Sequence, residues 1–266
     1  MMTLSIVTLI ICLMYSTANN LNDSIRCYAN CTISQSFDEQ LSLDNKCTEH
    51  IHSENCYAEM IFNYKERQVQ IVFGKYYTGQ SNSNAADTNN QYNMIKTTTM
   101  DLTRDNKMTK IRLIYTCKKN AQCDKEYVEK VYDEYILMKT DILEDELASL
   151  LFDDEFSSTT NSLTCRDNSQ CYNHTLCVIH YHIPLYKKYP SDSFCEPSYK
   201  RNQSVIIIET IEGTTHSPTR IHKCNTNNCL AENYINQIDE IFEKNPIIKS
   251  VTTVETITSR IVSGNE

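Results

Sequence analysis

The sequence predicts an α+β protein made of two tandem small disulfide-bonded β-rich modules, each followed by an amphipathic helix. A cysteine loop leads into a helical pattern twice, first over residues 117–152 and again over residues 224–242. Before each loop, apolar and polar residues alternate, which is typical of half-buried strands. Twelve of the thirteen cysteines remain once Cys12, in a predicted signal segment, is set aside. An even number of cysteines in a secreted chain indicates a disulfide framework.

The two cysteine loops and their helices align with one gap. The matched pairs are Tyr127 with Tyr234, Val128 with Ile235, Val131 with Ile238, Asp133 with Glu240, and Tyr135 with Phe242. A second similarity links residues 64–68 to residues 199–203, and each segment leads into an apolar run. These two matches predict that the chain arose by duplication of one module.

The beginning of the chain predicts a secretory signal. Residues 1–15 carry no charge, residues 9–14 are apolar, and small residues follow at 16–18. The apolar run is shorter than the roughly 20 residues that a membrane helix needs, so no stable membrane insertion is expected. The predicted organisation is a signal peptide (1–18), a first cysteine-rich module with an acidic helix (19–156), a linker (157–164), a second cysteine-rich module with a helix (165–244) and a weakly ordered tail (245–266).

Alternation in the first module predicts strands over residues 58–64, 69–73 and 111–115, with a polar loop or insertion over residues 79–93. In the helix that follows, Asp124 is expected to be the N-cap. The predicted buried stripe consists of Val128, Val131, Tyr135, Met138 and Ile142.

Asp141 and Glu144 resemble a capping box that restarts the helix toward Leu147, Leu150 and Leu151. In the second module, strands are expected over residues 177–183 and 205–208.

The cysteines divide evenly between the modules, six in each. The predicted bridge-forming residues are Cys27, Cys31, Cys47, Cys56, Cys117, Cys123, Cys165, Cys171, Cys177, Cys195, Cys224 and Cys229. Six cysteines allow fifteen connectivities per module, and only the two short terminal loops are expected to close internally. Structural zinc would need paired C-x2-C spacings, which the sequence lacks.

Four sequons predict N-linked glycosylation in a secreted chain, at Asn22, Asn30, Asn173 and Asn202. The net charge of −9 is concentrated between Glu126 and Glu155, a segment with eleven acidic residues and two lysines. The rest of the chain is balanced, so no basic surface for nucleic acid is expected. The acidic segment instead favours an extracellular protein partner with a basic surface.

The strand, cysteine and asparagine at the end of the second module, Lys223-Cys224-Asn225, with Cys229 closing the loop, resemble the final loop of Ly6/uPAR-type three-finger domains. The resemblance extends more loosely to Cys117 and Cys123. It differs from the family pattern in having a single cysteine before the loop, Leu230 or Asp124 where the family has asparagine, and a helix afterwards. The resemblance implies an extracellular, β-rich, protein-binding module.

Candidate chemical sites are few. His180 and His182 share one strand face, and His50 and His52 make a similar pair, but a metal site needs a third ligand, so a solvated face is favoured. Residues 153–155 are acidic but lack the glycine turn of a calcium loop. No nucleophile motif or phosphate loop occurs, so we expect no catalytic residues and no cofactor.

Tyrosine is the more informative side chain, with 17 tyrosines and no tryptophan. Tyr76, Tyr77 and Tyr92 fall outside the predicted buried stripes and border the polar insertion, which makes them a candidate contact loop. The sequence therefore predicts a secreted, glycosylated, non-catalytic binding protein. A structural or self-associating extracellular matrix protein is the alternative, and an unrecognised secreted hydrolase is a lower alternative.

Overall fold

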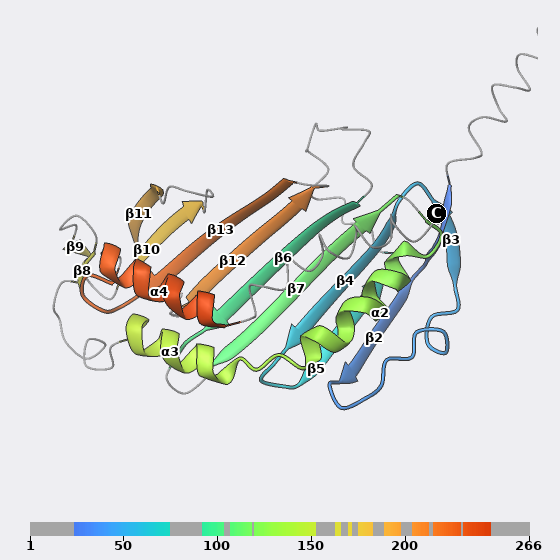
Figure 1. Cartoon of the computed structure of the whole chain (residues 1–266), viewed down its shortest axis with the longest axis horizontal. Coiled ribbons are helices and arrows are strands. Elements are labelled where there is room, and N and C mark those ends of the chain that lie inside the picture. The colour runs from blue at the N-terminus through green and yellow to red at the C-terminus, as the bar shows by residue number, and fades with distance from the viewer. Residues whose placement is uncertain are drawn as a thin grey trace, which may run out of the picture.

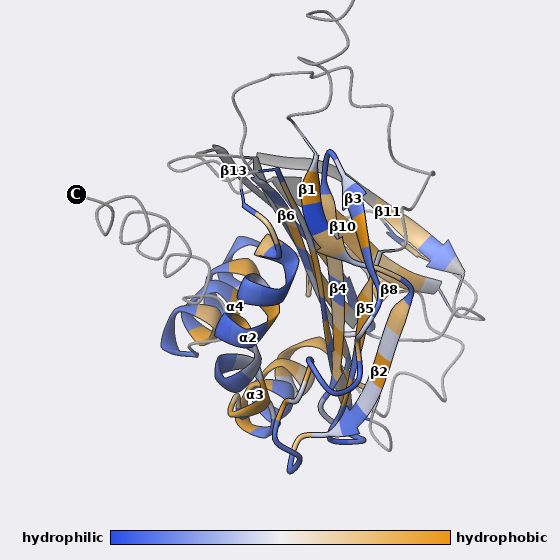
Figure 2. Ribbon diagram, turned by 90° about the vertical axis from the view of Figure 1, so that its right-hand side faces the viewer, coloured by the Kyte–Doolittle hydropathy of each residue, from blue (hydrophilic) through white to orange (hydrophobic). Residues whose placement is uncertain are grey.

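The computed structural model describes residues 24–74, 92–103, 107–118, 120–152, 163–165, 170–171, 175–182, 189–197, 204–212, 215–229 and 231–245. We call residues 24–152 the N-terminal half and residues 163–245 the C-terminal half. Strands dominate both halves, and the three helices of the described chain lie on one face of a single large sheet (Figures 1 and 2). The predicted signal peptide falls outside the described residues, as does nearly all of the predicted tail.

Nine antiparallel strands form the large sheet in the order β11-β10-β13-β12-β6-β7-β4-β5-β2. Two short sheets, β1-β3 and β8-β9, lie apart from it. The strands are β1 (Ile25–Tyr28), β2 (Cys31–Ser36), β3 (His50–Ser53), β4 (Cys56–Asn63), β5 (Gln68–Phe73), β6 (Tyr92–Asp101), β7 (Met108–Cys117), β8 (Leu163–Thr164), β9 (Gln170–Cys171), β10 (Thr175–His182), β11 (Tyr189–Pro197), β12 (Ser204–Glu212) and β13 (Thr215–Cys224).

The halves meet within the sheet, where β6 pairs with β12. The pairing runs from Asp101 opposite Ser204 to Asn93 opposite Glu212. Side chains alternate between the two faces of a strand. The helix side of this junction therefore buries Lys96 and Thr98 of β6 together with Ile207 and Glu209 of β12. The sequence predicted two modules but not this shared sheet.

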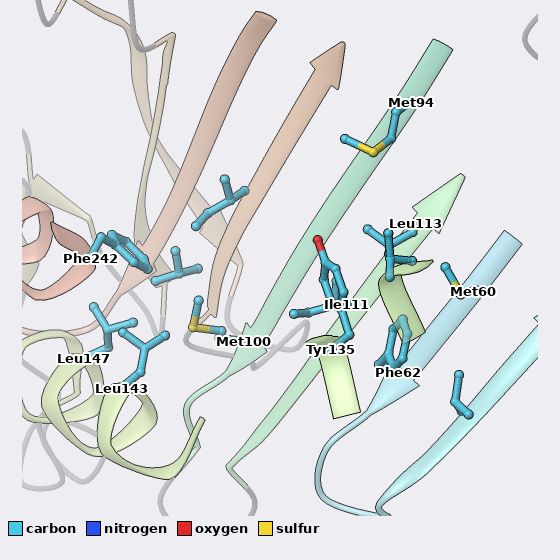
Figure 3. Close-up of a cluster of buried hydrophobic side chains, with 14 of the residues drawn as sticks. Met60, Phe62, Met94, Met100, Ile111, Leu113, Tyr135, Leu143, Leu147 and Phe242 are labelled. Atoms are coloured by element: carbon cyan, nitrogen blue, oxygen red, sulfur yellow. The ribbon is translucent and has the colours of Figure 1, made fainter. Parts of the chain in front are cut away.

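The core lies between the sheet and the helices α2 (Cys123–Ile136), α3 (Asp141–Leu151) and α4 (Glu232–Lys244). Figure 3 shows side chains from both layers in the core, including Phe62, Leu113 and Tyr135 from the N-terminal half and Phe242 from α4. All four of these side chains are buried. The alternation predicted for the strands ending at Phe73 and Cys117 is confirmed by their buried faces.

The start of α2 differs from the sequence prediction. The N-cap is Gln122, in the left-handed conformation with φ 62°, and it makes no side-chain capping bond. Asp124 lies in the first turn instead, fully buried. Its carboxylate accepts hydrogen bonds from the backbone N–H of Tyr28 at 3.1 Å and of Lys125 at 3.0 Å. Asp124 therefore joins the helix to β1, and burial raises the pKa of its carboxyl group.

The predicted buried stripe ends sooner than expected. Helix α2 stops at Ile136, and Ile142, which the 3.6-residue period placed in the core, is 62% exposed. A new helix does begin at Asp141, but its N-cap is Thr140 and no side-chain capping bond forms, so the capping box is wrong. Glu144 instead accepts a hydrogen bond from the Thr109 hydroxyl at 2.5 Å, which joins α3 to β7.

Candidate protein-binding surface

All twelve cysteines that the sequence assigned to bridges are paired. The disulfide bonds are Cys27–Cys56, Cys31–Cys47, Cys117–Cys123, Cys165–Cys177, Cys171–Cys195 and Cys224–Cys229. Each bond joins two cysteines of the same half, and the two terminal loops close internally as predicted. The sulfur clusters that could otherwise hold a metal, such as Cys56 with Cys117 and Cys123, consist of sulfurs already in these bonds. Disulfide sulfurs are not thiolates, so these clusters do not form zinc sites.

The histidine pairs do not converge with other ligands in the described part of the chain. His50 stacks on Tyr28, with ring centroids 4.7 Å apart, and its Nε2 lies 3.3 Å from the Gln122 side-chain amide. His52 is exposed on β3. His180 lies near the ring of Phe194, at 5.5 Å between centroids. Among the described residues, no cluster of three potential metal ligands contains a histidine.

Of the four sequon asparagines, only Asn30 is described. It is exposed in the turn between β1 and β2 and has a left-handed φ of 49°. Asparagine tolerates this conformation better than most residues. The turn packs closely on Gly74, where an added Cβ would lie 2.8 Å from the Ala29 Cα. Asn22, Asn173 and Asn202 fall outside the described residues.

The candidate tyrosine loop is only partly within the described chain. Tyr76 and Tyr77 lie outside it, and Tyr92 is half-buried at the start of β6. Tyr92 stacks near Tyr115, which in turn stacks on Tyr127 with centroids 3.9 Å apart. Burial raises the pKa of Tyr115 to about 12. The tyrosines seen here are therefore packed side chains, with Tyr92 at the outer end of the row.

The outer face of the helix layer is acidic. Ten acidic side chains are exposed on the three helices, against the exposed lysines Lys130 and Lys244 on the helices and Lys139 between α2 and α3. The exposed acids are Glu126, Glu129, Asp133, Glu134, Asp141, Asp145, Glu146, Glu232, Glu240 and Glu243. We call these ten residues the acidic face. Figure 2 shows the helices together on one side of the sheet, so the charges of α2, α3 and α4 share that side.

Part of the negative charge predicted for this segment is used internally. Asp124 and Glu144 are buried, as described above. Lys125 binds Asp44 at 2.6 Å and approaches Glu129 at 3.7 Å. Lys107 forms an ion pair with Asp145. Ten exposed acids against three exposed lysines still leave this surface predominantly negative, and its potential extends roughly 8 Å at physiological ionic strength.

Residues 153–155, considered for calcium, lie outside the described chain. No helix among the described residues is both long and apolar enough to cross a bilayer. No family model matches the chain, and neither the curated proteins nor the solved structures include a significant match.

Sequence reasoning missed the polar contacts beneath α4. Arg220 of β13 binds Asp239 of α4 at 2.5 Å, and its guanidinium carbon lies 4.5 Å from the centre of the Phe242 ring. His222, two residues further along β13, is fully buried. Positions 220 and 222 carry polar residues where a buried strand face would be apolar, so periodicity offered no signal for these contacts.

Proposed function

We propose that this chain is a secreted, glycosylated, non-catalytic protein that binds an extracellular partner with a basic surface through its acidic face. The observation that carries the proposal is the acidic face itself, displayed on a sheet whose cysteines are all bridged. A disulfide framework fits an oxidising, extracellular compartment. A predominantly negative surface raises the association rate with a positively charged partner and disfavours acidic partners.

The proposal includes two duplicated modules. Support comes from the positions of equivalent cysteines: Cys56 lies opposite Cys117 on neighbouring strands, and Cys177 lies opposite Cys224. In each half the first of these bonds to an earlier cysteine and the second closes the terminal loop. Helices α2 and α4 then follow the closing loops.

The junction of the halves supports the same idea. Thr97 of β6 lies opposite Arg112 of β7, and Ile208 of β12 lies opposite Thr219 of β13. Arg112 and Thr219 each lie five residues before the cysteine that begins the closing loop of their half. Thr97 and Ile208 also lie opposite each other. A local two-fold axis between two like modules would place equivalent residues opposite each other in an antiparallel strand pair, as is found here.

The resemblance to Ly6/uPAR-type domains is part of the proposal and is supported by the way β13 runs directly into the Cys224–Cys229 loop. The helices beyond the loops are an addition to that plan. What the resemblance contributes is the expectation of protein binding outside the cell.

The proposal is tested by cross-linking the secreted chain on cell surfaces and identifying its partners. A triple variant, E129Q/D133N/E134Q, removes three charges from the acidic face. The matched control, E39Q/E49Q/E54Q, removes three exposed charges from the N-terminal half outside the helices. We expect the first variant to lose capture of a basic partner and the control to keep it. Equal capture by both variants, or capture that high salt does not weaken, would contradict the proposal.

A further inference from the structure

Two large apolar side chains are exposed near the junction of α2 and α3, because Leu137 directly follows α2 and Ile142 is the second residue of α3. Leu137 is 76% exposed and Ile142 is 62% exposed, the highest values among the large hydrophobic residues described. Four residues of chain separate them, including Lys139. We call Leu137 and Ile142 the apolar corner. A single exposed leucine needs no explanation, but two such residues only five positions apart, at adjoining helix ends, make an exposed apolar feature.

The apolar corner is held on both sides by contacts to the core. Ile136 and Met138, which flank Leu137, pack against the hydrophobic core. The Tyr64 hydroxyl donates a hydrogen bond to the Tyr135 carbonyl oxygen at 2.7 Å, which anchors the end of α2. On the other side, Leu143 is buried, and the bond from Thr109 fixes Glu144. Binding at the apolar corner therefore requires little ordering of the backbone, which lowers the entropic cost of association.

Acidic residues flank the apolar corner on both helices. Asp133 and Glu134 occupy the last turn of α2, and Asp141 and Asp145 occupy the first turns of α3. All four are exposed and belong to the acidic face. Two copies of the chain meeting at this corner would bring these like charges together, which disfavours a second copy as the occupant.

We propose that the apolar corner is the anchor point of the acidic face and binds an apolar side chain carried by a lysine- or arginine-rich segment of a partner protein. Charge complementarity selects the basic segment, and burial of Leu137 and Ile142 supplies the contact that salt does not screen. Anchors of this kind, an apolar centre inside a polar rim, commonly dominate the free energy of an interface. The proposal rests on the basic partner proposed above and adds where and how that partner is held.

The experiment uses the full secreted chain and two synthetic lysine-rich peptides that differ only in a central leucine or serine. Binding is measured by fluorescence anisotropy. The wild type should bind the leucine peptide at least about tenfold more tightly than the serine peptide, as loss of one anchor contact implies. The double variant L137S/I142S should bind both peptides equally. The control I51S changes another exposed apolar residue, 44% exposed on β3, and should behave as wild type.

The outcomes separate this inference from the proposed function. If neither peptide binds the wild type, the basic partner and the apolar corner both fail. If both peptides bind equally, or if L137S/I142S retains the preference for leucine, the proposed role of the apolar corner is wrong, and the proposal that the acidic face binds a basic partner is retained. Circular dichroism of L137S/I142S should match the wild type, because both side chains are exposed. A dimer of the wild type that L137S/I142S abolishes would assign the corner to a second copy and overturn the inference.

Discussion

Helices α2 and α4 each follow a closing cysteine loop and pack on the same face of the sheet, but they do so with different chemistry. Helix α2 packs through rings: Tyr127 stacks on Tyr115, and Tyr135 stacks on Phe62 at 5.2 Å between centroids. Helix α4 packs through the Arg220 guanidinium, which binds Asp239 and lies over the Phe242 ring.

The difference can be followed position by position from the closing cysteines. Two residues before the cysteine, β7 has Tyr115 and β13 has His222; four residues before it, β7 has Leu113 and β13 has Arg220. Burial and the nearby charge of Arg220 lower the pKa of His222 to about 3. The helix position thus follows from the loop and the sheet, whereas the packing chemistry beneath it varies. We therefore expect the stability of the N-terminal half to depend mainly on apolar packing, and that of the C-terminal half to depend mainly on buried charged and polar groups.

The largest effect should come from the ring contacts of the N-terminal half. Phe62→Ala removes a fully buried ring that stacks on Tyr135 and should lower the free energy of unfolding by about 3–5 kcal/mol, because it leaves a cavity. Guanidinium denaturation with disulfides intact measures it. Val72→Ala is the control, since Val72 is half-buried on the opposite sheet face. Equal losses for both variants would show that the helix side is not the main core.

The boundary between the halves contains a buried ion pair, and breaking it should come next. The Lys96 ammonium lies 3.1 Å from a Glu209 carboxylate oxygen, with both side chains buried. Lys96→Met removes the positive partner of the buried Glu209 carboxylate and should cost about 3–4 kcal/mol in the same denaturation experiment. Adding Glu209→Leu should restore most of that loss. If the double variant is as unstable as Lys96→Met, this explanation is wrong, because the two side chains would then stabilise the junction by more than cancelling each other's charge.

Removing the charged contact beneath α4 should have a smaller effect. Arg220→Leu introduces the residue type that the N-terminal half has at this position, and it should cost about 1.5–3 kcal/mol because Asp239 loses its charged hydrogen bond. Asp38→Asn is the control, since the Asp38–Arg67 pair is exposed and contributes at most about 1 kcal/mol. An Arg220→Leu variant as stable as the wild type would mean that the apolar contacts of α4, including those of Ile238 and Phe242, hold the helix without the ion pair.

The smallest effect, and the most specific to the C-terminal half, is a pH dependence. Unfolded chains protonate His222 near pH 6.5, whereas the folded chain resists protonation until about pH 3. Protonation therefore favours unfolding, and stability falls as the pH falls through this window. Linkage gives a loss of about 2 kcal/mol between pH 7 and pH 5 from this group. Denaturation curves at both pH values should show that His222→Gln loses about 2 kcal/mol less than the wild type over this interval. An identical pH dependence in both proteins would place His222 in a solvated environment.

Much of the local structure was predictable. Two-residue periodicity located the strands that include Met60, Phe62 and Ile71, because their alternate residues are buried against the helices. Helical spacing and the repeated cysteine loop located α2 and α4. The 3.6-residue period failed when it was continued across the break between α2 and α3, so that Ile142 was predicted to be buried and is exposed. They also failed at Asp124 and Glu144, whose carboxylates bond to distant residues rather than cap a helix.

The β-rich class, the even set of bridge-forming cysteines and the acidic charge could all be predicted from the sequence, because they depend on composition and short-range spacing. The pairing of the eight cysteines outside the two terminal loops, the junction of β6 with β12 and the polar contacts of Arg220 and His222 emerge only in the folded chain. These features depend on which strands become neighbours. That choice reflects the burial of a whole sheet face, a long-range property that periodicity along one strand does not contain.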